Sequence, residues 1–427
     1  MDRALLLALP LPGSAPGDTS LLETPVGGVP LLKRQTRLAQ AVGAREVTIV
    51  CAAAAQGALA ASLAGRLAPA PVRWLTVSDP SEAPGAIQRW CAAQDAPFLA
   101  TSVWDVFERG ATARTLSLTP RPGELVVTTV EGRPATLIAA GPGAPLGALL
   151  ATWPDAAEAP TARELPAKEL AGRIRDRASL EAAAHRLWEG CRKPLDGFVS
   201  RNLNRHVSLF ISRRIAHTGI DPNHISFLNL ALGLAGGVIA AMGGYWPFLI
   251  AAALLKANSI LDGVDGELAR MRIQASVLGE WLDTISDDLS NQAFFIGVAI
   301  GAWRMTGDAS WLALGAATAV PMGLVTAYYY RWCIQNGRGD ILAFQWTFQT
   351  ETLTQEEREA ATWLHRTLGF FKTLFRKDAF VMMFLLAAIA GVLPWSLWVV
   401  APAAFATLFM LIGQHFKQRA HDRRLAA

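Results

Sequence analysis

The pattern of apolar and polar positions divides the chain into two parts. Up to about residue 150, short apolar runs (LLLAL, VTIVCA, VRWLTV, PFLAT) alternate with helical, Ala-rich stretches such as VPLLKRQTRLAQAVG. Strands that alternate with helices predict an α/β domain with a mostly parallel sheet. We interpret the first run as a buried strand rather than a signal peptide, because Pro interrupts the segment and no clear cleavage site follows.

The second part alternates long apolar segments with short connections. Six such segments are present, at residues 224–243, 245–261, 284–303, 310–332, 379–394 and 396–414. Most of them approach the roughly 20 residues that a helix needs to cross the hydrocarbon of a membrane. Lys and Arg gather in alternate connections and in the tail, so the positive-inside rule places both termini and the first domain in the cytoplasm, at the inner membrane.

Between these parts lie a linker and a basic helical stretch. Residues 154–170 are rich in Pro, Ala and Glu and are typical of a linker or domain edge. In the next stretch, Leu203, Val207, Phe210 and Ile211 recur at helical spacing, while Arg201, Arg205, Arg213 and Arg214 take other positions. This predicts a helix in the headgroup plane of the membrane; a surface helix packed on the soluble domain is the alternative.

These patterns predict four regions. They are an α/β domain at 1–155, a linker and helix at 156–190, a basic juxtamembrane interfacial helix at 191–222, and an all-α membrane domain of six helices at 223–420. Composition agrees, because 52% hydrophobic residues and a mean hydropathy of +0.28 exceed the values of an ordinary soluble protein. A formal charge of +4 is too small to indicate nucleic acid, and the basic residues adjoin apolar segments, so the lipid bilayer is the expected partner. The four cysteines show neither metal-ligand spacing nor a disulfide framework.

Candidate chemistry is concentrated across the second and third apolar segments, which read LDGVDGELARMRIQASVLGEWLDTISDD. Asp262 and Asp265 are three residues apart, and Asp283 and Asp287 are four apart, so each pair shares one helix face. Ionised side chains at such a depth are costly and usually mark a functional site. Ligation by carboxylates alone predicts Mg²⁺ or Mn²⁺ and a substrate that carries phosphate.

Small and basic residues accompany these aspartates. Gly263 and Gly266 flank Asp265, and their lack of side chains predicts that a nucleotide can approach the backbone. Arg270, one turn after Gly266, can grip a phosphate through its planar guanidinium. Gly279 is expected to keep the third segment open to the same ligand.

The segment resembles the signature of the CDP-alcohol phosphatidyltransferases, D-x2-D-G-x2-A-R-x8-G-x3-D-x3-D. All eight fixed positions are met, by Asp262, Asp265, Gly266, Ala269, Arg270, Gly279, Asp283 and Asp287. The resemblance implies a homodimeric six-helix membrane enzyme that transfers a phospho-alcohol group from a CDP-alcohol to a hydroxyl acceptor and releases CMP. It also implies two Mg²⁺ or Mn²⁺ ions held by the four aspartates, with Asp287 as the base.

The same resemblance implies where the substrates bind. The CDP group is expected at Asp221, Pro222, Asn223, His224, Gly266, Ala269, Arg270, Ser276 and Gly279. Arg376 and Lys377 fall where relatives with a phosphorylated acceptor hold its phosphate, although anchoring at the membrane surface explains these two residues as well.

The stretch KPLDGFVSRNLNRHVS, followed by DPNHIS, looks like the segment before the membrane domain of the di-myo-inositol phosphate phosphate synthases. This implies inositol or an inositol phosphate as acceptor and leaves the donor open between CDP-diacylglycerol and CDP-inositol. The first domain resembles the sugar-nucleotidyltransferase domain of those relatives, with a Rossmann-type sheet, and Asp105 falls near its metal-binding aspartate. However, LPLPGSAPGDTSLLETPVGG offers no basic residue before Lys33, so we interpret the domain as degenerate and inactive.

Two other functions stay open. A bifunctional enzyme would have an active cytidylyltransferase in its first domain. A cation carrier or channel would use the membrane carboxylates as an ion pathway, but it leaves Gly266, Ala269 and Arg270 unexplained.

Overall fold

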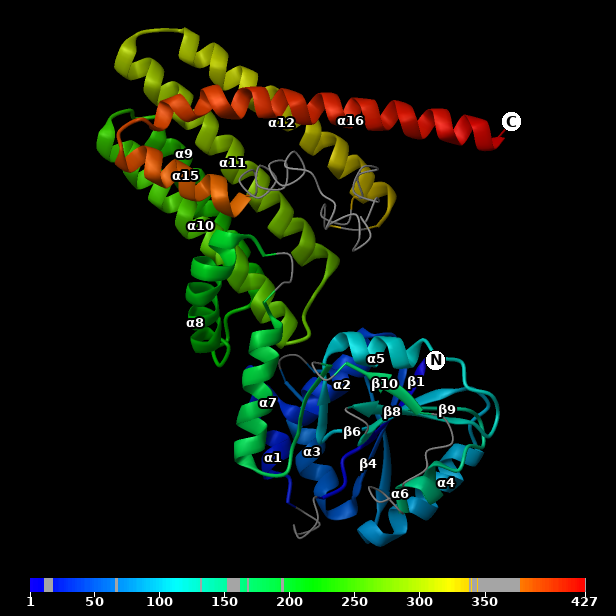
Figure 1. Cartoon of the computed structure of the whole chain (residues 1–427). Helices are drawn as coiled ribbons and strands as arrows, with labels where there is room; N and C mark the ends of the chain where they lie inside the picture. The colour runs from blue at the N-terminus through cyan, green and yellow to red at the C-terminus, as the bar shows by residue number, and fades with distance from the viewer. Residues whose placement is uncertain are drawn as a thin grey trace. The chain divides into compact units, whose positions relative to one another are not determined.

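The computed structural model describes residues 1–10, 18–65, 68–130, 133–151, 162–166, 169–192, 196–337, 339, 344 and 377–426. The chain forms two compact units, whose elements are labelled in Figure 1. The first unit comprises Met1–Cys191 together with the short segments Ala216–Thr218 and Arg270–Gln274. The second unit comprises Arg192–Ile215, Gly219–Ala269 and Ala275–Ala427.

The first unit contains a seven-stranded sheet with the strand order β10-β8-β9-β6-β1-β4-β5. Its strands are β1 (Arg3–Leu7), β4 (Glu46–Ala52), β5 (Arg73–Val77), β6 (Phe98–Ser102), β8 (Leu125–Val130), β9 (Arg133–Ala140) and β10 (Ala162–Leu165). Strands β6, β1, β4 and β5 are parallel, whereas β9 is antiparallel to both of its neighbours. Residues 4–7 of β1 are all buried, as expected for a central strand covered on both faces.

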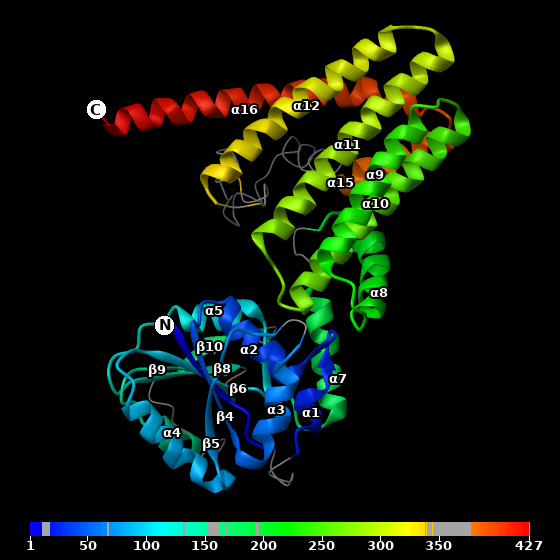
Figure 2. The same cartoon turned by 180° about the vertical axis from the view of Figure 1, so that it is seen from behind.

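Helices cover this sheet on both sides (Figure 2). The helical elements of the unit are α1 (Ser20–Glu23), α2 (Leu31–Ala41), η1 (Ala53–Ala55), α3 (Gln56–Leu63), η2 (Pro80–Glu82), α4 (Ala83–Ala92), α5 (Arg109–Leu116), α6 (Leu146–Ala151) and α7 (Arg177–Gly190). On one face, Ile87 of α4 and Leu146 of α6 pack on Leu5, Leu7 and Ile138 of the sheet. Two short antiparallel sheets of two strands complete the unit: the hairpin of β2 (Pro25–Val26) with β3 (Val29–Pro30), and β7 (Asp105–Phe107) paired with β11 (Leu170–Arg173).

The predicted α/β class of the first domain is confirmed. The four apolar runs form β1, β4, β5 and β6, and the stretch that follows Gly27 and Gly28 forms α2. The structure differs at β10, which lies inside the stretch predicted as a linker. Three of the four residues of this strand are exposed, so an edge strand of this kind leaves almost no hydrophobic pattern in the sequence.

The cysteines are buried. All four, which lie within the described ranges, are without disulfides. Burial raises the pKa of Cys51 to about 11 and that of Cys91 to about 12. These two thiols are therefore protonated at neutral pH and poor nucleophiles.

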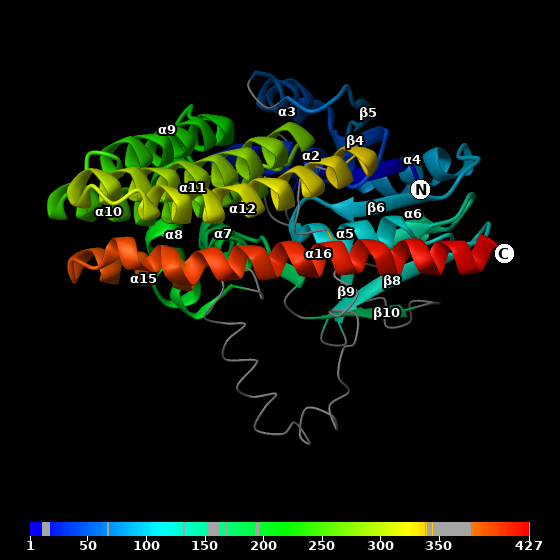
Figure 3. The same cartoon turned by 90° about the horizontal axis from the view of Figure 1, so that it is seen from above.

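The second unit is helical. Its elements are a π-helical turn η4 (Ser200–Asn204), α8 (Arg205–Ile215), α9 (Pro222–Ala240), α10 (Tyr245–Met271), α11 (Val277–Thr306), α12 (Ser310–Gln335), α15 (Lys377–Ile389), η7 (Leu393–Ser396) and α16 (Leu397–Ala426). Figure 3 shows α9, α10, α11 and α12 side by side, and α11 packs on both α9 and α12. The rings of Phe294, Phe295 and Phe384 have centroids 5.6 to 5.9 Å apart and join α11 to α15.

Four segments of the described chain are long and apolar enough to cross a membrane. They are Pro222–Ala240, Tyr245–Met271, Ser310–Gln335 and Leu393–Phe416. These four segments support the prediction that the chain is a membrane protein. Helix α11 carries acidic residues in its first half, and α15 has 13 residues, so the number of six spans stays a prediction.

Several apolar side chains of η4 and α8 are exposed. Leu203, Val207 and Phe210 are 42%, 37% and 58% exposed, which suits the predicted position at a membrane surface. Arg205, however, does not share the exposed polar face expected of the arginines, because its side chain is buried against carboxylates. Burial of a guanidinium is tolerated where such partners satisfy its donors.

Candidate active site

The turn before α9 forms a well-defined helix N-terminus. The carboxylate of Asp221 accepts a hydrogen bond from the backbone N–H of Asn223 at 3.1 Å, and Pro222 occupies the first helical turn. The backbone N–H of Asp221 in turn donates to Nδ1 of His224 at 3.3 Å. Such a start fixes the backbone and presents the positive end of the helix dipole, which favours an anionic ligand.

The N-terminus of α11 lies next to that of α9. Oγ of Ser276 caps α11 by accepting a hydrogen bond from the backbone N–H of Gly279 at 3.1 Å. A Cβ atom added to Gly279 would lie 3.5 Å from Oδ1 of Asn223. Residues from two separate segments that were predicted to bind CDP are therefore brought together at two neighbouring helix N-termini.

Hydrogen bonds connect α9, α10 and α11 at the signature. Asp265 is 5% exposed, and its Oδ2 accepts a hydrogen bond from Oγ of Ser226 at 2.6 Å. Its Oδ1 accepts one from the backbone N–H of Gly266 at 2.5 Å. Oγ of Ser286 donates to the carbonyl of Ser226 at 3.2 Å. These bonds fix Asp265 between the three helices.

The other signature aspartates meet around a lysine. The carboxyl group of Asp262 is within hydrogen-bonding reach of those of Asp283 and Asp287. Nζ of Lys377, from the start of α15, lies 3.5 Å from Oδ2 of Asp262 and forms an ion pair with Asp287. We refer to Asp262, Asp265, Asp283 and Asp287 as the carboxylate cluster.

The negative charges of the carboxylate cluster are only partly paired within the protein. Oδ1 of Asp283 and Oδ1 of Asp287 are buried and accept no hydrogen bond from the protein. The ammonium of Lys377 pairs with two of the four carboxylates, and a bound cation would compensate the remaining acidic groups. Oxygen donors of this kind suit Mg²⁺ or Mn²⁺. In the described ranges, no three His, Cys, Asp or Glu side chains already stand in metal-ligand geometry.

The remaining predicted site residues are placed as follows. Ala269 and Arg270 lie in the last turn of α10, and Nη2 of Arg270 donates to the carbonyl of Cys191 at 3.3 Å. Nε of Arg270 is buried and makes no hydrogen bond with the protein. Lys377 begins α15, and Arg376 lies outside the described residues.

A second buried acidic group on α10 was missed by sequence reasoning. Glu267 is fully buried, and its Oε1 accepts hydrogen bonds from Nη1 of Arg205 at 2.8 Å and Oγ of Ser208 at 2.7 Å. Its Oε2 accepts one from Oγ of Ser212 at 2.7 Å. Arg205 also forms a bidentate pair with Asp196, at 2.7 and 3.0 Å. We call these five residues the glutamate network.

This network changes the interpretation of Gly263. A Cβ atom at Gly263 would lie 3.2 Å from Cβ of Ser208 and 3.3 Å from Nη1 of Arg205. The expectation that Gly263 makes room for a nucleotide is therefore wrong, because the residue faces α8. Its missing side chain permits the close approach of α8 to α10.

Asp105 of the first unit serves the fold. It is 3% exposed, and its Oδ2 accepts hydrogen bonds from the backbone N–H and Oγ1 of Thr136, at 3.0 and 2.6 Å. Its Oδ1 accepts a hydrogen bond from Nε of Arg173 at 2.8 Å. Both oxygens are thus used by neighbouring strands.

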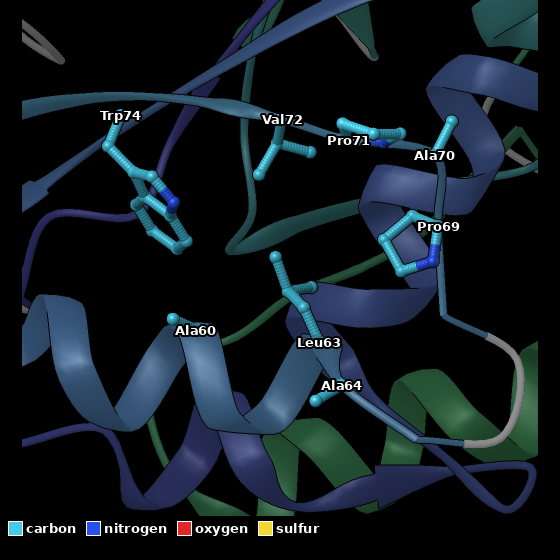
Figure 4. Close-up of a pocket in the computed structure, with 8 residues that line it drawn as sticks. All are labelled: Ala60, Leu63, Ala64, Pro69, Ala70, Pro71, Val72 and Trp74. Carbon is cyan, nitrogen blue, oxygen red and sulfur yellow. The ribbon is translucent and has the colours of Figure 1, made fainter.

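Two pockets elsewhere contain none of the predicted site residues. One, of about 300 Å³ in the first unit, is lined by apolar side chains, among which Leu63, Val72 and Trp74 point toward a common space in Figure 4. The other, of about 480 Å³, lies between α12 and α16 and is lined by Leu324, Tyr328, Arg331, Leu408, Leu411, Ile412, His415 and Phe416.

Comparison with known proteins agrees with the signature. Residues 220–403 match the family model of the CDP-alcohol phosphatidyltransferases. Proteins named bifunctional IPC transferase and DIPP synthase are similar to the chain. The one from Aquifex aeolicus is 38% identical over 105 residues, which is 25% of this chain and 23% of that protein. The one from Thermococcus kodakarensis is 34% identical over 116 residues, or 27% of this chain and 25% of that protein.

A third relative with the same name, from Rubrobacter xylanophilus, is 37% identical over 126 residues, or 29% of this chain and 28% of that protein. The chain thus spans about a quarter of the length of the relatives that it matches. Among solved structures, HddC from Yersinia pseudotuberculosis aligns with a TM-score of 0.27 and 12% identity, over 39% of this chain and 90% of that one. That score is too low to support any conclusion.

Proposed function

We propose that the chain is a membrane enzyme that transfers a phospho-alcohol group from a CDP-alcohol to a hydroxyl acceptor and releases CMP, because residues 220–403 match the family model of the CDP-alcohol phosphatidyltransferases. The observation that carries this proposal is the carboxylate cluster. Its four acidic side chains come from two apolar helices, and two buried oxygens in it lack a hydrogen-bond partner from the protein. Incomplete compensation of this kind is typical of a site that binds a further charged group.

The carboxylate cluster would hold two Mg²⁺ or Mn²⁺ ions through Asp262, Asp265, Asp283 and Asp287. When bound, such ions offset the charge of a diphosphate and make CMP a better leaving group. Asp287 would accept the proton of the acceptor hydroxyl. Its contact with the ammonium of Lys377 supports this role, because the ion pair orients the carboxylate.

The CDP group would bind at the N-termini of α9 and α11. Asp221, Pro222, Asn223 and His224 shape the first of these, and Ser276 and Gly279 the second. Backbone N–H groups and the helix dipoles favour phosphate there. In the signature helix, Gly266 and Ala269 would leave space for the nucleotide, and Arg270 would bind a phosphate through its guanidinium.

We propose inositol or an inositol phosphate as acceptor, with CDP-diacylglycerol or CDP-inositol as donor. The names of the relatives and the resemblance of the juxtamembrane segment support this choice. If the acceptor is phosphorylated, Arg376 and Lys377 would hold its phosphate. The position of Lys377 beside the proposed base supports that assignment, because it would bring the bound acceptor close to Asp287.

The membrane domain would consist of six spanning helices, with α11 and α15 completing the four apolar ones, and would form a homodimer. The active site and the first unit would face the cytoplasm from the inner membrane, as the distribution of Lys and Arg in the connections predicts.

The first unit would be a degenerate nucleotidyltransferase-like domain. Asp105 supports this, because both of its oxygens are already used within the fold. A bifunctional enzyme is the second candidate, which the names of the relatives favour. Incubation of purified protein with CTP and inositol 1-phosphate tests it, because pyrophosphate release that Asp105→Ala abolishes would establish an active first unit.

The test of the proposed function is a CMP-release screen of the purified protein in detergent. CDP-diacylglycerol and CDP-inositol are each offered with inositol, inositol phosphates or glycerol phosphate, with and without Mg²⁺. We expect CMP only with Mg²⁺ and only from pairs that include an inositol compound. Cation flux into proteoliposomes without CMP from any pair would instead identify a carrier or channel.

A further inference from the structure

A further polar cluster lies at the start of α15, directly after Lys377. Asp378 is 9% exposed, and its Oδ2 accepts a hydrogen bond from the backbone N–H of Ser200 at 2.8 Å. A Cβ atom added to Gly197 would lie 2.7 Å from Cγ of Asp378, so glycine is needed there for the carboxylate to approach the backbone this closely. All of these residues belong to the second unit.

Helix α10 supplies a buried lysine to the same cluster. Nζ of Lys256 donates a hydrogen bond to Oδ1 of Asn204 at 2.7 Å, and the ammonium also interacts electrostatically with Asp378. Nδ2 of Asn204 donates to Oγ of Ser259 at 3.3 Å. The cluster thus joins the segment around η4 to α10 and α15. We call its members the Asp378 network: Gly197, Ser200, Asn204, Lys256, Ser259 and Asp378.

The carboxylate of Asp378 completes the first turn of the helix formed by η4 and α8. This helical stretch begins at residue 198, so the N–H of Ser200 belongs to its first turn, whose N–H groups have no carbonyl partner within the helix. A carboxylate at this end is favoured by the hydrogen bond and by the helix dipole. The stretch continues as the π-helical η4, a rare form that is frequent at functional sites. Asp378 is therefore anchored at a defined point of this helix.

The anchoring of Asp378 also fixes the direction of Lys377. Successive residues of a helix point about 100° apart, so the first residue of α15 takes a set direction once the second is held on η4. In that direction, Nζ of Lys377 lies 3.5 Å from Oδ2 of Asp262 and pairs with Asp287. A lysine side chain is long and flexible and does not define such a position by itself.

We propose that Asp378 is a positioning residue, which sets the ammonium of Lys377 beside Asp287 so that it can bind the phosphate of the acceptor. Ser200 and Lys256 hold Asp378 in place for this role. The inference rests on the proposed function, since it takes the acceptor phosphate as the ligand of Lys377. A phosphate held at this point brings the acceptor close to the proposed base, and such placement lowers the barrier to transfer.

The experiment measures CMP release by the full chain in detergent with Mg²⁺, with inositol 1-phosphate as the acceptor and CDP-inositol or CDP-diacylglycerol as the donor. Asp378→Asn keeps the size of the side chain but removes its charge. The KM for inositol 1-phosphate should therefore rise about tenfold, the effect of one charge-assisted hydrogen bond. The KM for the donor should stay at the parent value, and kcat should change less than the acceptor KM. Lys256→Met should raise the acceptor KM in the same direction but by less.

Glu267→Gln is the matched control for Asp378→Asn. It also alters a buried carboxylate that binds the helix formed by η4 and α8, but its partners Arg205, Ser208 and Ser212 lie on α8 and not on α15. This variant should lose stability and keep both KM values of the parent. An equal rise of the acceptor KM in the two variants would show a general loosening of the fold and would refute a specific role of Asp378.

A double variant shows whether Asp378 acts through Lys377. Lys377→Met should raise the KM for inositol 1-phosphate about 10- to 100-fold, and adding Asp378→Asn should have no further effect, because residues that act through one another are not additive. If Asp378→Asn does not fold, Lys256→Met takes its place in this cycle.

The outcomes separate this inference from the proposed function. Effects of the two single variants that multiply would overturn the positioning role, as would a parent-like acceptor KM in Asp378→Asn. A parent protein that uses inositol but not inositol 1-phosphate would also overturn it and leave the proposed function intact. A parent that releases no CMP with any acceptor would contradict the proposed function itself.

Discussion

The glutamate network and the carboxylate cluster both include acidic residues of α10, and they differ in how completely their carboxylates are paired within the protein. In the glutamate network, every carboxylate oxygen of Glu267 and Asp196 accepts a hydrogen bond from Arg205, Ser208 or Ser212. In the carboxylate cluster, buried oxygens of Asp283 and Asp287 accept none from the protein. Burial of charge alone therefore does not distinguish the two groups; the carboxylate cluster differs in its unpaired buried oxygens, whose partners a bound ligand can supply.

The largest effect that tests this comparison is loss of turnover in the carboxylate cluster. Asp287→Asn keeps the shape of the side chain but removes the proposed base, so CMP release should fall by about 100- to 10,000-fold, the usual contribution of a general base. The fold and metal binding should be largely retained. CMP release under saturating substrates measures the effect, and melting in detergent reports on the fold.

The neighbouring Asp288→Asn is the control for Asp287→Asn. Asp288 contacts the hydroxyl of Tyr330 and lies about 100° around the helix from Asp287. Its variant should keep CMP release within a few-fold of the parent. If Asp287→Asn turned over like Asp288→Asn, the assignment of the base would be wrong.

Breaking the glutamate network should lower the free energy of unfolding rather than the rate of CMP release. Arg205→Met leaves the buried carboxylates of Glu267 and Asp196 without their cation, which should lower the free energy of unfolding by about 3 to 5 kcal/mol. Denaturation in mixed detergent micelles measures this loss. Arg201→Met is the matched control: Arg201 is exposed on the same segment and should change stability by less than about 0.5 kcal/mol. Equal stability of the two variants would remove the distinction between the two acidic groups.

Asp105 of the first unit should behave like the glutamate network. Asp105→Asn loses the charge-assisted bond from Arg173, so the free energy of unfolding should fall by about 1.5 to 3 kcal/mol. CMP release at saturating donor should stay at the parent level. Asp95→Asn, at a carboxylate whose side chain is 82% exposed, should leave thermal unfolding unchanged. A loss of pyrophosphate release from CTP in Asp105→Asn, without loss of stability, would make Asp105 catalytic instead.

The sequence predicted the elements whose patterns are local. Strands β1 and β4 and helix α2 follow from runs of apolar residues, and the four signature aspartates follow from their spacing. Strand β10 was missed because an exposed edge strand carries no periodic signal. The exact surroundings of the site depend on distant partners: Lys377 reaches Asp287 from 90 residues along the chain.

The glutamate network could not be predicted for a related reason. Glu267 stands at a variable position of the signature and looks like an ordinary charged residue of a helix end. Only packing of α8 against Gly263 shows that it is buried and paired.

The smallest predicted effect is a gain in stability, whereas the variants of the glutamate network and of Asp105 lose stability. It tests the difference between the carboxylate cluster and the glutamate network. Asp283→Asn removes one of several like charges that face one another, and it leaves a side chain of the same size that can donate a hydrogen bond to the neighbouring carboxylates. The metal-free protein should therefore become more stable, by about 0.5 to 2 kcal/mol, whereas Glu267→Gln should make it less stable. Thermal unfolding in EDTA measures both variants.

Adding Mg²⁺ should raise the melting temperature of the parent more than that of Asp283→Asn, because only the parent keeps all four carboxylates for the ions. A destabilised Asp283→Asn in EDTA would mean that the cluster is compensated within the protein after all, and the case for a cation site would fail.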